Sequence, residues 1–287
     1  MADLNLRPLS LGELLDRTFT LYRQHFALFV GITAIPQLLI LAFNLFSGFV
    51  PGVSPQPMGA PVHGRVASAS VPSTFWLGAI VAIVIYLVVY LFAQGGTFFA
   101  VSEIYLGRAT TIGKSLQQMR GHLINLLGVT VVNGLVVGLA TLLLIIPGIY
   151  MACRLLTCVP AALFENLGPR DSIERSYSLT EDEAGRAFII LLLYFVLAMV
   201  AAMLFEFPFT LAAMLIPGYP GGSAPLWIAL SHVGHFLGTV LVTPYLTIAT
   251  AVFYYDLRVR REAFDLQLMM NAAAPLSPAP GAPPTLA

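Results

Sequence analysis

The charged residues of this 287-residue chain are separated by long uncharged stretches. These stretches cover residues 24–64, 66–102, 121–153 and 207–255. A helix needs about 20 apolar residues to cross the hydrocarbon core of a bilayer, and one charged side chain at its centre costs about 2.5–3.5 kcal/mol. The pattern therefore predicts an all-α fold, a polytopic bundle of transmembrane helices.

The composition excludes several other classes of protein. With 58% hydrophobic and 10% charged residues, the chain is too apolar to form the surface of a soluble protein. Its formal net charge is zero, which argues against a nucleic-acid partner. The first apolar run begins near Phe26, after a polar segment that contains acidic residues, so we expect no cleavable signal peptide. Cys153 and Cys158 fit neither a redox nor a zinc spacing.

Apolar runs of sufficient length predict about six crossings. We place them at residues 26–47, 75–101, 123–146, 148–165, 187–216 and 226–255. Pro147 and Gly148 separate the third from the fourth, because proline followed by glycine breaks a helix. The segment 148–165 is short and carries Arg154, so it either spans fully or re-enters.

The basic residues predict the orientation of these crossings. Twelve of the fourteen Lys and Arg residues fall on one side of the six-crossing arrangement, and the exceptions are Arg65 and Arg154. The positive-inside rule assigns this side to the cytoplasm. We therefore expect both termini and the loops 102–122 and 166–186 to be cytoplasmic. Residues 1–271 form one integral membrane domain, whereas 51–74 and the Ala/Pro-rich tail 272–287 are predicted to be disordered.

A repeated pattern precedes the odd-numbered crossings. Residues 13–21 (ELLDRTFTL) match residues 171–179 (DSIERSYSL) nearly position by position in chemical type, and residues 111–119 contain a weaker copy. We interpret these as three repeats, at about 8–105, 109–168 and 169–262, each an in-plane helix followed by a hairpin. In this scheme Arg17 and Arg175 occupy equivalent positions.

The segments before the odd crossings are predicted to be amphipathic. Ser10 and Glu13 have the spacing of a capping box, and the apolar residues that follow recur at helical intervals. Such helices either bind lipid headgroups or a protein partner on the cytoplasmic face, or pack as plain elbows beneath their own bundle. The interfacial basic residues are Arg17, Arg23, Lys114 and Arg175.

Several strings resemble one known family: LSLGELLDR (9–17), IPGI (146–149) with Arg154, IERS (173–176) and FYYDLRVRR (253–261). They are similar to the bacterial membrane domain attached to some glycerophosphoryl diester phosphodiesterases, which also occurs alone. The resemblance covers nearly all of residues 6–268 and implies a bacterial inner-membrane location. A soluble phosphodiesterase barrel needs about 250 residues, and no stretch is left to supply one. The resemblance therefore does not imply that enzymatic activity.

Ionisable residues inside crossings are candidates for a functional site. By helical rise, Arg154, Glu206, His232 and His235 all fall in the outer half of the bilayer, and we expect Arg154 and Glu206 to form an ion pair near His235. Such a set forms either a polar cavity for a substrate headgroup or proton, or a contact that merely joins helices. The uncharged polar residues nearer the middle of the membrane are Gln37, Gln94 and Asn133.

Three classes of function remain open. Neither a catalytic motif nor a cofactor fingerprint is present, and two histidines with one distant glutamate are a minimal ligand set, so we predict neither catalytic nor metal-binding residues. The structural character of the motifs favours a non-catalytic membrane scaffold or lipid-interaction module. A small-molecule or lipid transporter with an intramembrane polar cavity is the alternative. A membrane-embedded enzyme fits the sequence least well.

Overall fold

The chain forms an all-α polytopic membrane protein in a computed structural model, which describes residues 8–47, 73–105, 108, 110–215 and 224–262. The helices are α1 (Leu11–Gln24), α2 (Phe26–Ser47), α3 (Ser73–Tyr105), α4 (Ile112–Gln118), α5 (Leu123–Leu143), α6 (Ile145–Arg154), α7 (Cys158–Glu165), α8 (Pro169–Leu179), α9 (Ala184–Phe205), α10 (Phe207–Leu215) and α11 (Ala224–Glu262). A 3₁₀ turn (Met119–Gly121) joins α4 to α5. The predicted disordered tail 272–287 lies outside the described residues, as does 51–72 of the predicted loop.

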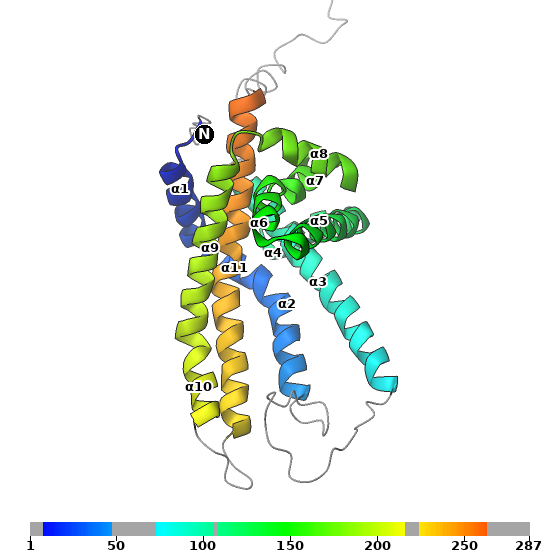
Figure 1. The fold of residues 1–287 in the computed structure, drawn as a ribbon, viewed down its shortest axis with the longest axis vertical. Helices are drawn as coiled ribbons and strands as arrows, with labels where there is room; N and C mark the ends of the chain where they lie inside the picture. The colour runs from blue at the N-terminus through cyan, green and yellow to red at the C-terminus, as the bar shows by residue number, and fades with distance from the viewer. Residues whose placement is uncertain (1–7, 48–72, 106–107, 109, 216–223, 263–287) are drawn as a thin grey trace, which may run out of the picture.

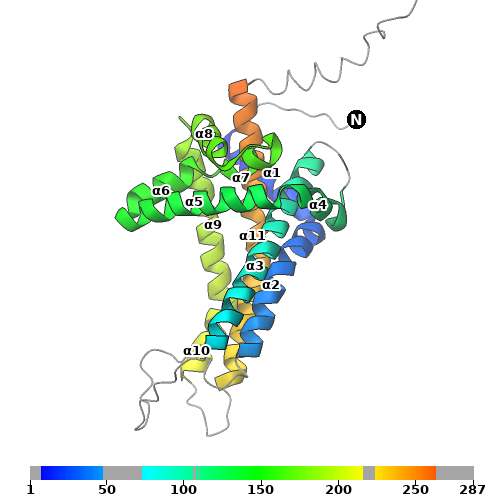
Figure 2. The ribbon, with the colours of Figure 1, turned by 90° about the vertical axis from the view of Figure 1, so that its right-hand side faces the viewer.

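Six helical segments are long and apolar enough to cross a membrane, which confirms the predicted fold class. They are Phe26–Phe46, Ile80–Tyr105, Leu123–Leu143, Ile145–Glu165, Ala184–Phe205 and Leu226–Glu262. Helices α2, α3, α9 and α11 run roughly along the long axis of the molecule (Figures 1 and 2). Helix α11 is central, because it contacts α1, α2, α3, α9 and α10.

Helices α5 and α6 lie across the long axis instead of along it (Figures 1 and 2). They pack on each other as a hairpin that projects to one side of the bundle. Its tip is strongly apolar and exposed, with Leu142, Leu143 and Ile146 each more than 80% accessible. The fourth predicted crossing is also not continuous, because α6 ends at Arg154 and α7 begins at Cys158.

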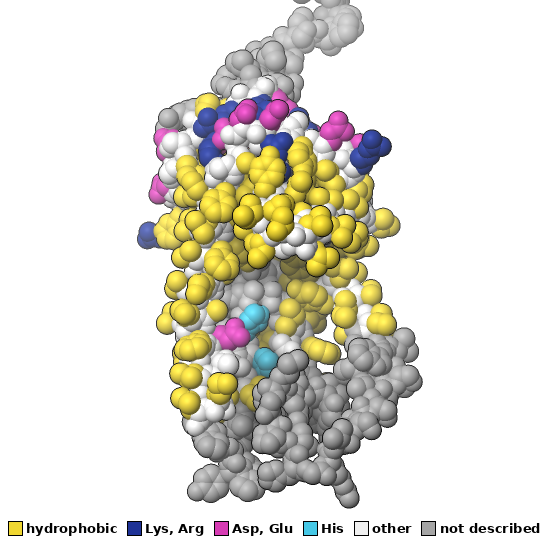
Figure 3. All heavy atoms as spheres, in the orientation of Figure 1, with side chains coloured by type: hydrophobic (Ala, Val, Ile, Leu, Met, Phe, Trp, Pro, Cys, Tyr) yellow, Lys and Arg dark blue, Asp and Glu magenta, His cyan; other side chains and the backbone are white. Residues whose placement is uncertain are grey.

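The packed core lies near the end of the molecule that carries most of the charges, hereafter the charged end (Figure 3). Five aromatic side chains from α3, α7 and α11 stack or meet edge to face there: Phe98, Tyr105, Phe164, Tyr254 and Tyr255. Towards the opposite end, α2 and α3 lie apart from α9 and α10, and many of their apolar side chains are exposed. The helices therefore pack closely at the charged end, whereas at the other end the pair α2 and α3 diverges from α9, α10 and α11.

Helices α1, α4 and α8 at the charged end bury residues at the same positions counted from their N-caps. Ser10 and Thr111 cap α1 and α4 by accepting hydrogen bonds from the backbone three residues on, and Ser10 and Glu13 form the predicted capping box. Gly168 precedes Pro169 at the start of α8. The residues four and eight positions after each cap are fully buried: Leu14 and Thr18, Ser115 and Met119, and Ser172 and Ser176. Helix α1 packs on α11, α4 on α3, and α8 on α7.

Candidate functional site

The predicted ion pair between Arg154 and Glu206 is wrong. The Arg154 guanidinium donates a hydrogen bond of 2.7 Å to the backbone oxygen of Thr180, which lies just before α9. Glu206 follows the last residue of α9. Because α9 has 22 residues, the two charges lie at opposite ends of a helix about 33 Å long. The predicted depth of Arg154 assumed that residues 148–165 form one straight crossing that begins at the outer surface, whereas α6 ends at Arg154.

Arg154 instead joins the C-terminal ends of α6 and α8. Arg154 is only 8% exposed, and its guanidinium lies 4.8 Å from the centroid of the Tyr177 ring. Its backbone oxygen accepts hydrogen bonds from the hydroxyls of Ser176 and Thr180, at 2.8 and 3.0 Å. A cation is favourable at helix C-termini and over aromatic faces, which offsets part of the cost of burying this charge. Arg154 therefore has a structural role at the charged end.

Glu206 and His235 do come together, as predicted for His235. A Glu206 carboxylate oxygen lies 3.0 Å from His235 Nδ1. Pro208, which lacks an amide hydrogen, follows the break between α9 and α10 and helps to explain why the helix is interrupted at Glu206. Gly234 permits the close approach of α11, because a Cβ atom there would lie 1.8 Å from the backbone oxygen of Phe205.

This pair lines a cavity of about 140 Å³. The cavity lies between α9 and α11, and its polar lining includes Tyr194, Thr239 and Thr243. His232, three residues before His235, is not among the lining residues. His235 and Asp256 are 21 residues apart on α11, which corresponds to about 31 Å. The pair therefore lies about one hydrocarbon thickness from the charged end.

A second cavity adjoins the first, because Thr243 lines both. It lies between α2, α3 and α11, and its lining includes Gln37 and Gln94. A third cavity, of about 460 Å³, shares no lining residue with the first; it is lined by apolar residues of α2 and α3 and by Tyr86, whose ring lies 5.9 Å from that of Tyr90 in the second cavity. We call the three together the side crevice. Figure 3 shows the hollow below the apolar band of the molecule, with acidic and histidine side chains beside it.

The interfacial basic residues are mostly engaged within the protein. Arg17 lies 4.6 Å from the centroid of the Tyr105 ring, and Lys114 lies 3.8 Å from Glu103. Arg23 is exposed on α1. Arg17 and Arg175 each lie seven residues after the N-cap of their helix, and the predicted repeat itself stays a prediction. The contacts of Arg17 and Arg175 are typical of elbow helices that pack beneath their own bundle, whereas Arg23 and Lys114 are exposed.

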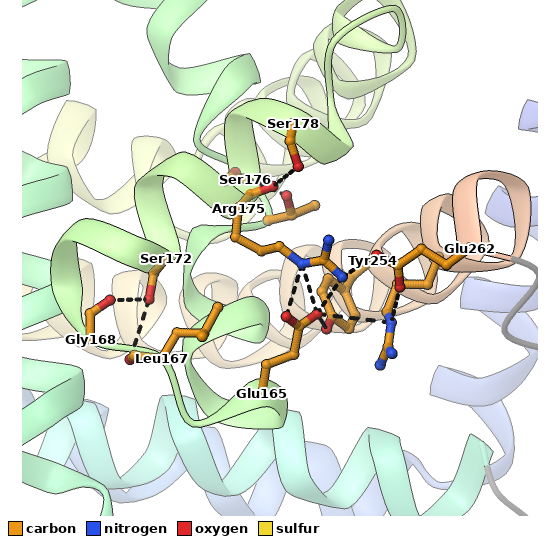
Figure 4. A network of polar contacts seen from close by, with 11 residues as sticks. Glu165, Leu167, Gly168, Ser172, Arg175, Ser176, Ser178, Tyr254 and Glu262 are labelled. Carbon is orange, nitrogen blue, oxygen red and sulfur yellow. Dashed lines mark hydrogen bonds and ion pairs between the residues drawn. The ribbon is translucent and has the colours of Figure 1, made fainter. Parts of the chain in front are cut away.

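Arg175 is the centre of a partly buried ionic network (Figure 4). It donates to both oxygens of Glu165, at 2.8 to 3.0 Å, and it also contacts Glu262. Tyr254 donates its hydroxyl hydrogen to Glu165. Burial lowers the pKa of Arg175, but the hydrogen bonds that Arg175 donates to Glu165 and Glu262, together with the negative charges of these carboxylates, outweigh this effect and hold the pKa above its usual value. The network fixes α8 to the ends of α7 and α11.

Sequence reasoning missed the most buried carboxylate, Asp256 of α11. Its side chain is inaccessible to solvent and receives hydrogen bonds from the backbone nitrogen of Leu9 at 2.6 Å and from Arg260 at 2.9 Å. Arg186 at the start of α9 lies 2.8 Å away and also bonds the Leu9 oxygen. The sequence pattern that could have pointed to Asp256 is a single acidic residue at the end of an apolar run, followed by three arginines. Its distant partners could not be inferred from that pattern.

Within the described residues, no three His, Cys, Asp or Glu side chains are grouped so that they could hold a metal ion. Comparisons with known protein families, curated proteins and solved structures find no match for this chain. The family resemblance drawn from the sequence therefore stays a prediction.

Proposed function

We propose that this integral membrane protein is a non-catalytic module that binds a lipid-like amphiphile in the side crevice. The observation that carries the proposal is the Glu206–His235 pair, the ionisable part of the lining of a cavity far from the charged end. A few polar groups that converge on a largely apolar cavity are the usual mark of a binding site. The pair is also accessible, since the side chains of Glu206 and His235 are 38% and 49% exposed.

The lining of the side crevice indicates the chemistry of the occupant. Glu206 uses one carboxylate oxygen on His235, and the other oxygen has no hydrogen-bond donor among the described residues, so it can accept one from a ligand. A carboxylate favours a headgroup that carries donors, such as an ammonium group. The neighbouring apolar cavity of about 460 Å³, lined by residues such as Phe43 and Ile83, suits a hydrocarbon chain.

The positive-inside rule supports an orientation with the charged end in the cytoplasm of a bacterial inner membrane. The side crevice then opens in the outer half of the bilayer. Headgroup binding by the basic residues of the cytoplasmic face is less favoured, because Arg17 already contacts the Tyr105 ring and Arg175 is already paired with Glu165.

Titration of delipidated protein with lysophospholipids tests the proposal. We expect saturable binding of an ethanolamine lysophospholipid, observed by native mass spectrometry, and at least tenfold weaker binding to Glu206→Gln, because a neutral amide loses the attraction to the ammonium group. Glu174→Gln is the matched control, since Glu174 is exposed on α8 at the charged end and should leave binding unchanged. Equal binding to all three proteins would contradict the proposal.

The crosswise hairpin α5–α6 is proposed to re-enter the membrane from the cytoplasmic side. Its exposed apolar tip belongs in hydrocarbon, whereas a full crossing would place it in the outer solvent. We expect a cysteine at Leu144 to resist a membrane-impermeant maleimide from both sides. A cysteine at Ser178, exposed on α8, should react once the membrane is permeabilised. Rapid labelling of Leu144→Cys from the outside would contradict the re-entrant hairpin and support two full crossings by α5 and α6.

The transporter alternative is favoured by one observation. Polar side chains continue inward from the Glu206–His235 pair along one face of α11, at Thr239, Thr243 and Thr247. The aromatic core at the charged end closes this path in the present conformation. Transport would therefore require a second conformation in which Phe164 and Tyr254 separate.

A further inference from the structure

The contact with Glu206 determines which nitrogen of a neutral His235 ring carries the hydrogen. An ionised carboxylate can only accept hydrogen bonds, so the 3.0 Å contact with Glu206 places the hydrogen on Nδ1. The lone pair is then on Nε2, and within the described residues no donor reaches that nitrogen. With a neutral ring, the pair therefore offers the cavity two acceptors, the second oxygen of Glu206 and Nε2 of His235.

Protonation of His235 changes both the charge and the hydrogen-bonding capacity of the pair. A protonated imidazole donates from both ring nitrogens, so Nε2 becomes a donor. The net charge of the pair changes from that of one carboxylate to zero. An ammonium group in the cavity then meets one acceptor and a neighbouring cation, where it had met two acceptors and a net negative charge.

The helices around the pair carry few other ionisable side chains. The membrane-spanning parts of α2, α3, α9, α10 and α11 are residues 26–47, 73–102, 187–215 and 224–255. In these ranges the only Asp, Glu, Lys, Arg or His residues are Glu206, His232 and His235. His232 is not among the residues that line the cavity. Glu206 and His235 therefore set the charge of the cavity.

The remaining neighbours do not titrate near neutral pH or lie further away. Tyr194 lines the same cavity, and tyrosine hydroxyls ordinarily stay neutral below about pH 9. Helices α1, α7 and α8 also contact α11. Among the described residues of these three helices, the polar contact with α11 that lies closest to the pair is the hydrogen bond from Tyr22 to the backbone oxygen of Leu241. Leu241 lies six residues beyond His235, or about 9 Å along the helix.

We propose that protonation of His235 is a switch that releases an ammonium-bearing amphiphile from the side crevice. This inference rests on the proposed function and adds its regulation. Histidine is the side chain whose charge ordinarily changes between about pH 5 and 8. With the charged end in the cytoplasm, the pair lies in the outer half of the bilayer, so the pH of the outer solution controls the switch. The amphiphile is held under mildly alkaline conditions and released on acidification.

Equilibrium binding of radiolabelled dodecylamine tests this proposal. The protein is held in neutral detergent micelles at about pH 8 and about pH 5.5, and empty micelles at each pH give the background. Alkylamines ordinarily titrate near pH 10, as lysine does, so the probe stays charged at both values and carries no phosphate. We expect the Kd to be about tenfold higher at the lower pH, because one acceptor for the ammonium group is lost. Dodecanol, a neutral probe of the same chain length, should show less than a twofold change.

Variants assign the pH dependence to one histidine. His235→Gln is neutral at both pH values, so its Kd for dodecylamine should change less than about twofold between them. His235→Arg is always charged and should bind as weakly at the higher pH as the wild type does at the lower one. His232→Gln is the matched control, because His232 lies on the same helix outside the cavity lining, and it should keep the full tenfold ratio. The ratio is measured within each protein, so a change in overall affinity does not affect it.

The outcomes separate the switch from the proposed function. Wild-type binding that is equal at both pH values, or a pH ratio that persists in His235→Gln, would overturn the switch and leave amphiphile binding standing. Absence of saturable binding at either pH would overturn the proposed function, and the switch with it.

Discussion

Replacement of Asp256 by alanine is expected to lower the free energy of unfolding by about 3–5 kcal/mol, because it removes a fully buried carboxylate and leaves Arg186 and Arg260 without their partner. Asp256 receives Arg186 at 2.8 Å and Arg260 at 2.9 Å, and its side chain is wholly buried. It also holds the backbone nitrogen of Leu9. The substitution therefore releases the segment before α1, the start of α9 and the end of α11 at once. Denaturant titration in mixed micelles measures the loss.

Asp182→Ala is the control for this prediction. Asp182 lies 3.3 Å from Arg261, but its side chain is 88% exposed, and exposed ion pairs contribute about 0–1 kcal/mol. The double variant Asp256→Ala, Arg186→Ala should regain part of the stability lost in the single variant. If Asp256→Ala costs no more than Asp182→Ala, Asp256 does not hold the charged end together.

Replacement of Arg154 by glutamine is expected to cost about 2–4 kcal/mol. A hydrogen bond from a charged donor contributes about 1.5–3 kcal/mol, and a desolvated cation over an aromatic ring adds about 1–2 kcal/mol. Arg154 makes both contacts, with Thr180 and Tyr177. Arg120→Gln, at an exposed position before α5, should change the free energy of unfolding by less than about 0.5 kcal/mol.

Double-mutant cycles separate the two arrangements of Arg154. We expect Arg154→Gln and Glu206→Gln to be additive within about 0.5 kcal/mol, because the residues lie at opposite ends of α9. Arg154→Gln and Tyr177→Leu should instead show coupling of about 0.5–2 kcal/mol. Coupling between Arg154 and Glu206 would contradict the observed contacts of Arg154 with Thr180 and Tyr177.

The fold class and most helix positions could be predicted from the sequence because they depend on local patterns. Uncharged stretches give the apolar segments directly, and the Ser10–Glu13 capping box is a contact between neighbours in the chain. The direction of α5 and α6 could not be predicted in the same way. Both helices are apolar around most of their surface, so their length permits a crossing, while the packing against α7, α8 and α9 decides their orientation.

The candidate site was predicted only in part, because local patterns fix the depth of some of its residues and tertiary packing fixes that of others. The depths of Glu206 and His235 follow from counting residues along nearly straight helices, so their proximity could be expected. The depth of Arg154 could not, because the helix ends at Arg154 itself and the chain turns before Cys158. Asp256 was missed because two of its partners, Leu9 and Arg186, lie 247 and 70 residues away in the sequence.

The most direct measurement of the central claim is a cryo-EM structure in lipid nanodiscs with saturating ethanolamine lysophospholipid. We predict density in the side crevice, with the headgroup beside Glu206 and the chain against Phe43 and Ile83. The hairpin α5–α6 should lie within the bilayer. A crevice closed by contact between α3 and α9, or lipid density confined to the outer surface of the bundle, would contradict the account.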